Sequence, residues 1–411
     1  MPNIINDKEK IKEVLTRGVE NIYPDRETVE KVLTSGKKIR IYCGFDPTAT
    51  SLHIGNAIQI NKLAQLQALG HEIIFLIGDF TGTIGDPTDK TATRKKLTRE
   101  DVNANSKNYK KQAGVYLKFT GDNPALVLRN SKWLDKISFK DLIEIASNFT
   151  VGQMIVRDMF QKRIEEGKPV HLHEFLYPLA QGYDSVAMDV DMEIGGNDQT
   201  FNMLCGRDLM KSTMNKEKFV LTTKLLVDDA GKKMGKSEGN IVNLDESPEN
   251  MYGKIMSWPD GAIINGFEFC TNIPMAEVEK MREELKSGKN PRDEKMKLAF
   301  EITKINHGEK KAEKAQKYFV KTVQKKEVPT DIETIRLPIN NYKLIDLLVE
   351  VNLANSKGEA RRLIEQGGIK IAIDKQELQS IKDVNADVNV TSGSLLIQRG
   401  KLKFVRVVGL E

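Results

Sequence analysis

The sequence predicts an α/β fold, with a parallel sheet in its first half and two smaller parts behind it. Between residues 39 and 227, short apolar runs alternate with helical stretches and glycine turns, as in a parallel sheet covered by helices. Between 247 and 326 the strand signal fades, and Lys, Glu, Ala and Leu recur with helical periodicity. Beyond residue 340, two helical stretches precede several short strands. This order predicts a Rossmann-like parallel-sheet domain with a helical lead-in at 1–240, an α-helical domain at 241–335 and a small α+β domain at 340–411.

The first elements predict one strand–helix–strand unit. The runs IRIYC at 39–43 and IIFLI at 73–77 are apolar throughout, as expected for strands covered on both faces. Between them, apolar residues recur at helical spacing over 56–69, and Gly70 follows where a left-handed residue would end the helix. Ligands of such sheets bind where strand ends meet helix N-termini, so we expect a site in the glycine-containing loop between them.

The C-terminal part begins after a predicted linker at 327–340, which contains Pro329 and Pro338. Helices are expected at 344–353 and 356–367, and short strands are expected at 369–373, 388–392, 394–400 and 402–408.

Composition excludes several classes of protein. The 411 residues carry 63 Lys and Arg against 58 Asp and Glu, and the net charge of +5 is too small for a protein that coats nucleic acid by charge alone. Three distant cysteines, Cys43, Cys205 and Cys270, indicate neither a disulfide framework nor a structural zinc site. The N-terminus lacks a signal-peptide core, and no apolar run is long enough to span a membrane. We therefore expect a soluble, cytoplasmic protein that does not bind membranes.

The loop at 42–56, YCGFDPTATSLHIGN, lies between a predicted strand end and a helix start. Gly44 and Gly55 allow a ligand to approach the backbone, while Thr48, His53 and Asn56 offer hydrogen-bond donors near a helix N-terminus, a setting that suits phosphate oxygens. The alternative is a turn followed by a capping histidine, and a short motif alone does not decide between the two.

A second loop, GKKMGKSEGN at 231–240, interleaves lysines with glycines. Lys233 and Lys236 are compact charges on a loop that can follow a moving polyphosphate, although a solvated charged turn has the same composition. The two loops together are far more specific than either alone.

A third pattern places Tyr177, Gln181 and Asp184 at i, i+4 and i+7, on one face of a predicted helix. An ordinary amphipathic helix with a capping Asp explains this spacing equally well. Upstream, His171, His173 and Glu174 superficially resemble a metal site, but no further ligand stands at metal-site spacing, so we predict no metal site.

The loops carry an HxGH-like and a KMSKS-like signature, which are features of class I aminoacyl-tRNA synthetases. The longer strings YCGFDPTATSLHIGN, IGDPTDKTATR, YPLAQGYDS, IGGNDQTFN and KKMGKS resemble those of the bacterial-type tyrosyl-tRNA synthetases, and the resemblance covers nearly the whole chain. It implies activation of L-tyrosine by ATP to tyrosyl-adenylate and pyrophosphate, followed by transfer to the 3′ end of tRNA(Tyr). It also implies a homodimer formed around residues 120 to 170, and Mg²⁺ that accompanies ATP.

The resemblance implies a role for each matching residue. The catalytic donors are Thr48, His53, Asn56, Lys233 and Lys236. Tyr42 and Asp184 contact the tyrosine hydroxyl, Tyr177, Gln181 and Asp86 bind its ammonium group, and Gln199 lies near its carboxyl side. ATP is bound by Gly44, Asp46, Gly55, Gly196, Asp198 and Lys236, with Asp198 on the ribose; Lys90 and Arg94 are further candidates for pyrophosphate contact.

The C-terminal segment is similar to a small RNA-binding domain first known from a ribosomal protein. Lys357, Arg361 and Arg362 fall on one predicted helix, and Lys370 follows a glycine turn. Basic residues facing phosphates supply affinity without reading sequence, although acidic neighbours dilute this face and leave a solvated helix as the alternative. By the same resemblance, the middle helical domain binds the anticodon region.

Two other functions are compatible with parts of this sequence. A tryptophanyl-tRNA synthetase has the nearest fold, but the C-terminal module and the Tyr42 and Asp184 pair argue against it. A synthetase-like protein that binds RNA without catalysis is disfavoured because His53, Lys233 and Lys236 are all retained.

One departure from the family signature generates a prediction. Asn56 stands where histidine often occurs, so hydrogen-bond donation survives while titration does not. We expect the rate of tyrosine activation to lack any pH step owed to this position, and we expect Asn56→His to introduce one. The pH–rate profiles of the two proteins provide the measurement, and identical profiles would contradict the expectation.

Overall fold

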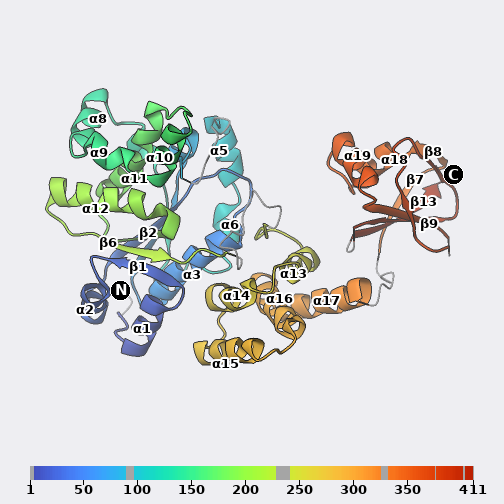
Figure 1. Cartoon of the computed structure of the whole chain (residues 1–411), viewed down its shortest axis with the longest axis horizontal. Coiled ribbons are helices and arrows are strands. Elements are labelled where there is room, and N and C mark those ends of the chain that lie inside the picture. Colours follow the sequence, from blue (N-terminus) through green and yellow to red (C-terminus); the bar gives the residue numbers. More distant parts are fainter. Residues whose placement is uncertain are drawn as a thin grey trace. The chain divides into compact units, whose positions relative to one another are not determined.

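The computed structural model describes residues 4–88, 97–227, 241–324, 332–374, 376–400 and 403–410. The chain forms two compact units. The first contains residues 1–246 and 257–298, and the second contains residues 247–256 and 299–411 (Figure 1).

A six-stranded sheet organises the first unit, in the order β1-β6-β5-β2-β3-β4. The five strands from β6 to β4 run parallel to their neighbours, which confirms the predicted parallel sheet. At one edge, β1 pairs antiparallel with β6 and had not been predicted. The strands are β1 (Val19–Tyr23), β2 (Arg40–Phe45), β3 (Glu72–Ile77), β4 (Leu126–Arg129), β5 (Met192–Gly196) and β6 (Phe219–Thr223).

The helices that position the site are α3 (Ile54–Ala68), α11 (Leu172–Met188) and α12 (Thr200–Met214). The helix α3 packs on β2, β3 and β5, and it ends just before Gly70, whose φ of 96° is the predicted left-handed conformation. The helices α11 and α12 pack against each other where both carry glycine: a Cβ added to Gly182 would lie 3.2 Å from the backbone nitrogen of Gly206. This close approach requires residues without side chains.

The remaining helices of the sheet region are short. They are α1 (Lys8–Thr16), α2 (Arg26–Thr34), α4 (Thr81–Ile84), α5 (Arg99–Ser106), α6 (Tyr109–Ala113), α7 (Ser131–Leu134), α8 (Phe139–Ala146), α9 (Val151–Ile155), α10 (Asp158–Glu165) and the 3₁₀ turn η1 (Asn197–Gln199).

The segment after residue 247 is helical, as its periodicity predicts. Its helices are α13 (Pro248–Met256), α14 (Ala262–Cys270), α15 (Met275–Lys286), α16 (Pro291–His307) and α17 (Glu309–Phe319), followed by a π-helical turn, η3 (Val320–Gln324). Within the described parts of the chain, no helix combines the length and the apolar character needed to cross a membrane.

The C-terminal residues form a small α+β fold, as predicted. Its helices α18 (Leu344–Glu350) and α19 (Lys357–Glu365) share an apolar core with the strands. A five-stranded sheet has the order β10-β9-β12-β13-β7, and a separate pair joins β11 to β8. The strands are β7 (Glu333–Pro338), β8 (Asn340–Lys343), β9 (Ile369–Ile373), β10 (Gln379–Ile381), β11 (Asp387–Val390), β12 (Ser394–Arg399) and β13 (Lys403–Leu410).

The predicted linker at 327–340 is wrong from residue 333 onward. There β7 pairs in parallel with β13, with Glu333 opposite Val405 and Pro338 opposite Leu410. The proline is tolerated because β7 is an edge strand.

Candidate active site

The predicted ligands of the first unit lie on β2, on α11 and on the segments that follow β3 and β5. Tyr42 and Asp46 belong to β2 and the loop after it, Asp184 belongs to α11, and Asp86 follows α4. Gln199 ends the η1 turn after β5. The carboxyl ends of parallel strands meet at one edge of a sheet, which is where such folds bind ligands.

Tyr42 is buried, and its hydroxyl lies 2.8 Å from the Ser185 hydroxyl. Burial, together with the nearby carboxylates Glu193 and Asp184, raises the pKa of the Tyr42 phenol well above its usual value. Tyr42 is therefore held as a neutral hydroxyl that can both donate and accept.

Asp184, also buried, accepts hydrogen bonds from Trp133 Nε1 at 2.7 Å and from Asn130 Nδ2 at 3.2 Å. Burial raises the pKa of the Asp184 carboxyl well above its usual value, and the two N–H donors partly offset that effect. The donors hold both carboxylate oxygens in place.

A chain of hydrogen bonds runs from Asp184 to Asp46. Asn130 Nδ2 also donates to Thr81 Oγ1 at 3.0 Å, and Thr81 donates to Asp46 Oδ1 at 2.6 Å. The other oxygen of Asp46 accepts from the Tyr177 hydroxyl at 2.9 Å. A Cβ at Gly78 would lie only 2.0 Å from Asp46 Oδ1, so this chain requires glycine there.

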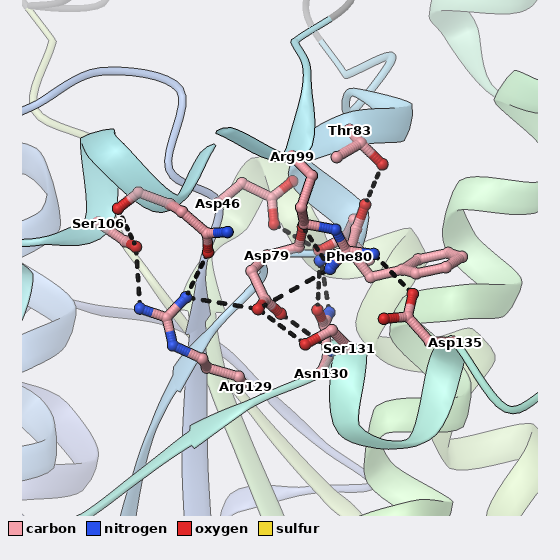
Figure 2. A network of polar contacts seen from close by, with 12 residues as sticks. Asp46, Asp79, Phe80, Thr83, Arg99, Ser106, Arg129, Asn130, Ser131 and Asp135 are labelled. Carbon is pink, nitrogen blue, oxygen red and sulfur yellow. Dashed lines mark hydrogen bonds and ion pairs between the residues drawn. The ribbon is translucent and has the colours of Figure 1, made fainter. Parts of the chain in front are cut away.

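A second carboxylate braces the turn that carries Asn130 (Figure 2). Asp79 accepts from the Ser131 backbone N–H at 2.9 Å and from the Ser131 hydroxyl at 2.8 Å. Arg129 forms an ion pair with Asp79 at 3.4 Å, and Arg99 bridges to Asp135 at 2.6 Å. The Asn130 side chain in turn accepts from the Phe80 backbone N–H at 2.9 Å. These contacts fix the Asn130 amide that serves Asp184.

The two segments after β3 and β5 meet at Asp86. Gln199 Nε2 donates to Asp86 Oδ2 at 2.7 Å, while Asp86 Oδ1 accepts from the Thr88 hydroxyl at 2.7 Å. Burial and the nearby Asp86 charge raise the pKa of the Asp198 carboxyl to about 6. Asp86, Asp198 and Gln199 therefore lie close together.

Gln181 joins a buried ion pair. Its Nε2 donates to Glu193 Oε1 at 3.0 Å, and the other Glu193 oxygen accepts from the ammonium of Lys218. Both Glu193 and Lys218 are buried.

The helix-capping alternative for the first loop holds in part. His53 occupies the N-cap position of α3, and its backbone N–H donates to Asn56 Oδ1 at 3.0 Å. Because the oxygen of the Asn56 amide faces the helix end, the other polar group of this side chain is its NH₂ donor. The Thr48 backbone N–H donates to the Asp46 carbonyl at 2.8 Å.

Four predicted contacts lie outside the described residues: Lys90, Arg94, Lys233 and Lys236. Among the residues that are described, no group of three or more His, Cys, Asp or Glu side chains could hold a metal ion. In the segment 171–174, whose sequence superficially resembles a metal site, the Glu174 carboxylate forms an ion pair with Arg163 at 2.7 Å.

The predicted RNA-binding residues of the second unit are exposed on and beside α19: Lys357, Arg361, Arg362 and Lys370. Lys357 pairs with Asp346 at 2.8 Å. Glu359, which dilutes the basic face in the sequence, bonds to Arg399 at 2.7 Å, so its charge is partly neutralised within the domain.

Sequence reasoning missed six residues that hold the predicted ligands in place: Thr81, Asn130, Trp133, Ser185, Glu193 and Lys218. They reach the site from α4, from the turn after β4, from α7, from α11, from β5 and from the residue before β6. Only Ser185, next to Asp184 in YPLAQGYDS, stands inside a string that pointed to the site.

Comparisons with known proteins agree along the whole chain. The family model described as tRNA synthetases class I (W and Y) matches residues 34–324, and the model of the tyrosine–tRNA ligase SYY-like C-terminal domain matches 324–407. The tyrosine–tRNA ligase of Haemophilus ducreyi is 44% identical over 97% of this chain and 98% of its own. That of Thermotoga maritima is 42% identical over 98% of both chains.

A solved structure gives the same result. The C-terminally truncated mitochondrial tyrosyl-tRNA synthetase of Coccidioides posadasii superposes with a TM-score of 0.61, at 26% identity, over 75% of this chain and 91% of that one.

Asn130 provides a stability prediction. Asn130→Ala removes a buried hydrogen-bond partner from the Phe80 N–H, from Thr81 and from Asp184. We therefore expect the free energy of unfolding of the first unit to fall by about 2–4 kcal/mol. Denaturant unfolding followed by tryptophan fluorescence measures this loss, because Trp133 and Trp258 both lie in the first unit. Asn148→Ala, at an exposed position, should cost less than about 1 kcal/mol. Equal losses in the two variants would contradict the role given to Asn130.

Proposed function

The chain belongs to the bacterial-type tyrosyl-tRNA synthetases, and from that membership we propose how its residues divide the work. The enzyme is a class I tyrosine–tRNA ligase: it activates L-tyrosine with ATP to tyrosyl-adenylate and pyrophosphate, then transfers tyrosine to the 3′ end of its tRNA. The observation that carries the assignment of roles is that a neutral tyrosine, Tyr42, and a hydrogen-bonded aspartate, Asp184, are both buried, near enough for the Asp184 charge to act on the Tyr42 phenol.

Tyr42 and Asp184 recognise the substrate phenol. The phenol hydroxyl donates a hydrogen bond to Asp184 and accepts one from Tyr42. Trp133 and Asn130 already supply two donors to the Asp184 carboxylate, so a phenol O–H adds a third from the ligand side. Phenylalanine has no hydroxyl and would leave both buried groups without the partner that the phenol supplies, which carries a free-energy cost.

Tyr177, Gln181 and Asp86 bind the substrate ammonium group, and Gln199 lies at the carboxyl side. The bond between Gln199 and Asp86 supports this division, because it joins the side chains assigned to the two ends of the amino-acid backbone. The Tyr177 hydroxyl is oriented by Asp46.

The tyrosine carboxylate attacks the α-phosphorus of ATP, and negative charge builds on the departing pyrophosphate. Fixed hydrogen-bond donors aimed at this charge are the main catalytic device. Thr48, His53 and Asn56 supply them from the loop before α3, while Lys233 and Lys236, with Lys90 and Arg94, supply positive charge. Gly44, Gly55 and Gly196 admit the nucleotide, Asp46 and Asp198 bind it, and Mg²⁺ enters with ATP as part of the substrate complex.

The tRNA is held by the rest of the chain, in a layout of three domains at 1–240, 241–335 and 340–411. The helical domain binds the anticodon region, and Lys357, Arg361, Arg362 and Lys370 face RNA phosphates. Their exposure supports this role.

Two chains form a homodimer through residues 120 to 170, and the enzyme acts in the cytoplasm. Large apolar side chains exposed in and next to this segment support the dimer. Phe139, Val151 and Leu172 are each more than 70% exposed, which is unusual for residues of this kind on a monomer surface.

Pyrophosphate exchange tests the function. With ATP and labelled pyrophosphate, we expect exchange when tyrosine is supplied and little or none with tryptophan or phenylalanine. Exchange driven by tryptophan would assign the chain to the tryptophanyl enzymes instead. Failure with all three amino acids would point to an RNA-binding protein without catalysis.

Asp198 gives the reaction a pH dependence. The pKa of its carboxyl is raised to about 6, so as the pH falls through 6 the carboxylate takes up a proton and the ribose loses a charged acceptor. We expect kcat/KM for ATP to fall several-fold over this range in the wild type, and Asp198→Asn to remove that step at a lower overall rate. Asp208→Asn, an exposed aspartate on α12, should retain it. A step that persists in Asp198→Asn would assign the titration to another group.

A further inference from the structure

Lys218 is a buried cation that the proposed mechanism does not use. It directly precedes β6, and its side chain is fully buried. A lysine in this position must have all of its donors satisfied, because an unpaired buried ammonium is very costly.

The ammonium of Lys218 has three hydrogens and makes three hydrogen bonds. It donates to Glu193 Oε2, to Ser185 Oγ at 2.9 Å and to the Met203 carbonyl at 3.0 Å. Room for it comes from α12, where a Cβ at Gly206 would lie 2.6 Å from Lys218 Nζ and 2.8 Å from Ser185 Oγ. Three acceptors and a glycine slot make this a built cation site, not an accidental burial.

Each of two acceptors leads to a predicted tyrosine ligand. Ser185 lies between Lys218 and the Tyr42 hydroxyl. Glu193 lies between Lys218 and the amide of Gln181. One cation is therefore two hydrogen bonds away, through a single intervening side chain, from a residue assigned to the phenol end of the substrate site and from a residue assigned to its ammonium end.

Lys218 can only donate, and this favours one arrangement of donors and acceptors along the two paths. Ser185 Oγ accepts from it, and accepting from a cation strengthens the Ser185 hydroxyl as a donor to Tyr42. The proton of Tyr42 is then directed to a different acceptor. On the second path, Glu193 accepts from both Lys218 and the Gln181 NH₂ group, which leaves the carbonyl oxygen as the other polar atom of that amide.

We propose that Lys218 is a positioning residue that sets the hydrogen-bond polarity of the tyrosine site. Through Ser185 it makes Tyr42 a hydrogen-bond donor to the phenol oxygen, while the phenol hydroxyl donates to Asp184. Through Glu193 it makes Gln181 an acceptor, which is what an ammonium group requires. This inference rests on the proposed roles of Tyr42 and Gln181 as substrate ligands.

Substitutions at Lys218 and Ser185 test the proposal in the full chain. Lys218→Met removes the donors at similar side-chain length, Lys218→Gln keeps an NH₂ donor without charge, and Ser185→Ala cuts only the path to Tyr42. In pyrophosphate exchange, we expect Lys218→Met and Ser185→Ala to raise the KM for tyrosine about tenfold or more, with a smaller change in kcat. Lys218→Gln should stay within about threefold of the wild type. Ser185→Ala affects only the phenol end, so kcat/KM for phenylalanine should change by less than about threefold and the preference for tyrosine should fall. Lys218→Met also releases Gln181, which is assigned to the ammonium group of both amino acids, so it should lower kcat/KM with both, and more with tyrosine than with phenylalanine.

Lys216→Met is the matched control, since Lys216 pairs with Asp189 and Asp191 at the surface and has no bond to a predicted ligand among its described contacts. Lys216→Met should leave kcat and KM unchanged with both amino acids. Equal losses with tyrosine and phenylalanine, or identical behaviour of Lys218→Met and Lys218→Gln, would show a purely structural lysine and overturn the proposal.

If Lys218→Met does not fold, the result with Ser185→Ala decides whether the proposal stands. Wild-type protein without tyrosine-dependent exchange would overturn the proposed function as well, whereas wild-type exchange with an unchanged preference in the variants would overturn this inference alone.

Discussion

The first unit depends on one constraint: ionisable groups are buried at the ligand end of the sheet, and each must have hydrogen-bond partners there. Asp184, Glu193 and Lys218 are each less than 3% exposed. An isolated charge in such a place would be strongly destabilising, so its partners are as necessary as the apolar core around them. Those partners come from separate elements: Trp133 from α7, Gln181 and Ser185 from α11, and the Met203 carbonyl from α12. Satisfying the charges thereby fixes the helices relative to the sheet.

Glycine is what makes this arrangement fit. At Gly78 and Gly206 a Cβ would lie 2.0 Å from the Asp46 carboxylate and 2.6 Å from the Lys218 ammonium, distances that no side chain could tolerate. Both glycines lie outside the signature loops and have ordinary backbone conformations, since neither has a positive φ. Their role is to leave room for a polar side chain that arrives from another element.

The sequence allowed the parallel sheet, the helical segment and the C-terminal helices to be predicted, because periodicity is a local property. It did not predict β1 or β7, which are edge strands whose partners, β6 and β13, are distant in the chain. Family resemblance singled out Tyr42, Asp86, Asp184 and Gln199, and the structure brings Asp86 and Gln199 into direct contact. The side chains that orient them, such as Asn130 and Lys218, belong to no motif because their function is defined only by a contact between elements.

Asp46 shows how closely the two substrate sites are joined. It was assigned to the nucleotide, yet one of its oxygens accepts from Tyr177, which is assigned to the amino acid. Its other oxygen accepts from Thr81, which in turn accepts from the Asn130 amide. The same Asn130 NH₂ group donates its second hydrogen bond to Asp184, which is assigned to the phenol end. Since one amide serves both carboxylates, a displacement of Asp184 must also disturb Thr81 and Asp46. In the proposed division of roles, the phenol ligand Asp184 and the nucleotide ligand Asp46 therefore depend on the same buried asparagine, which couples the two sites.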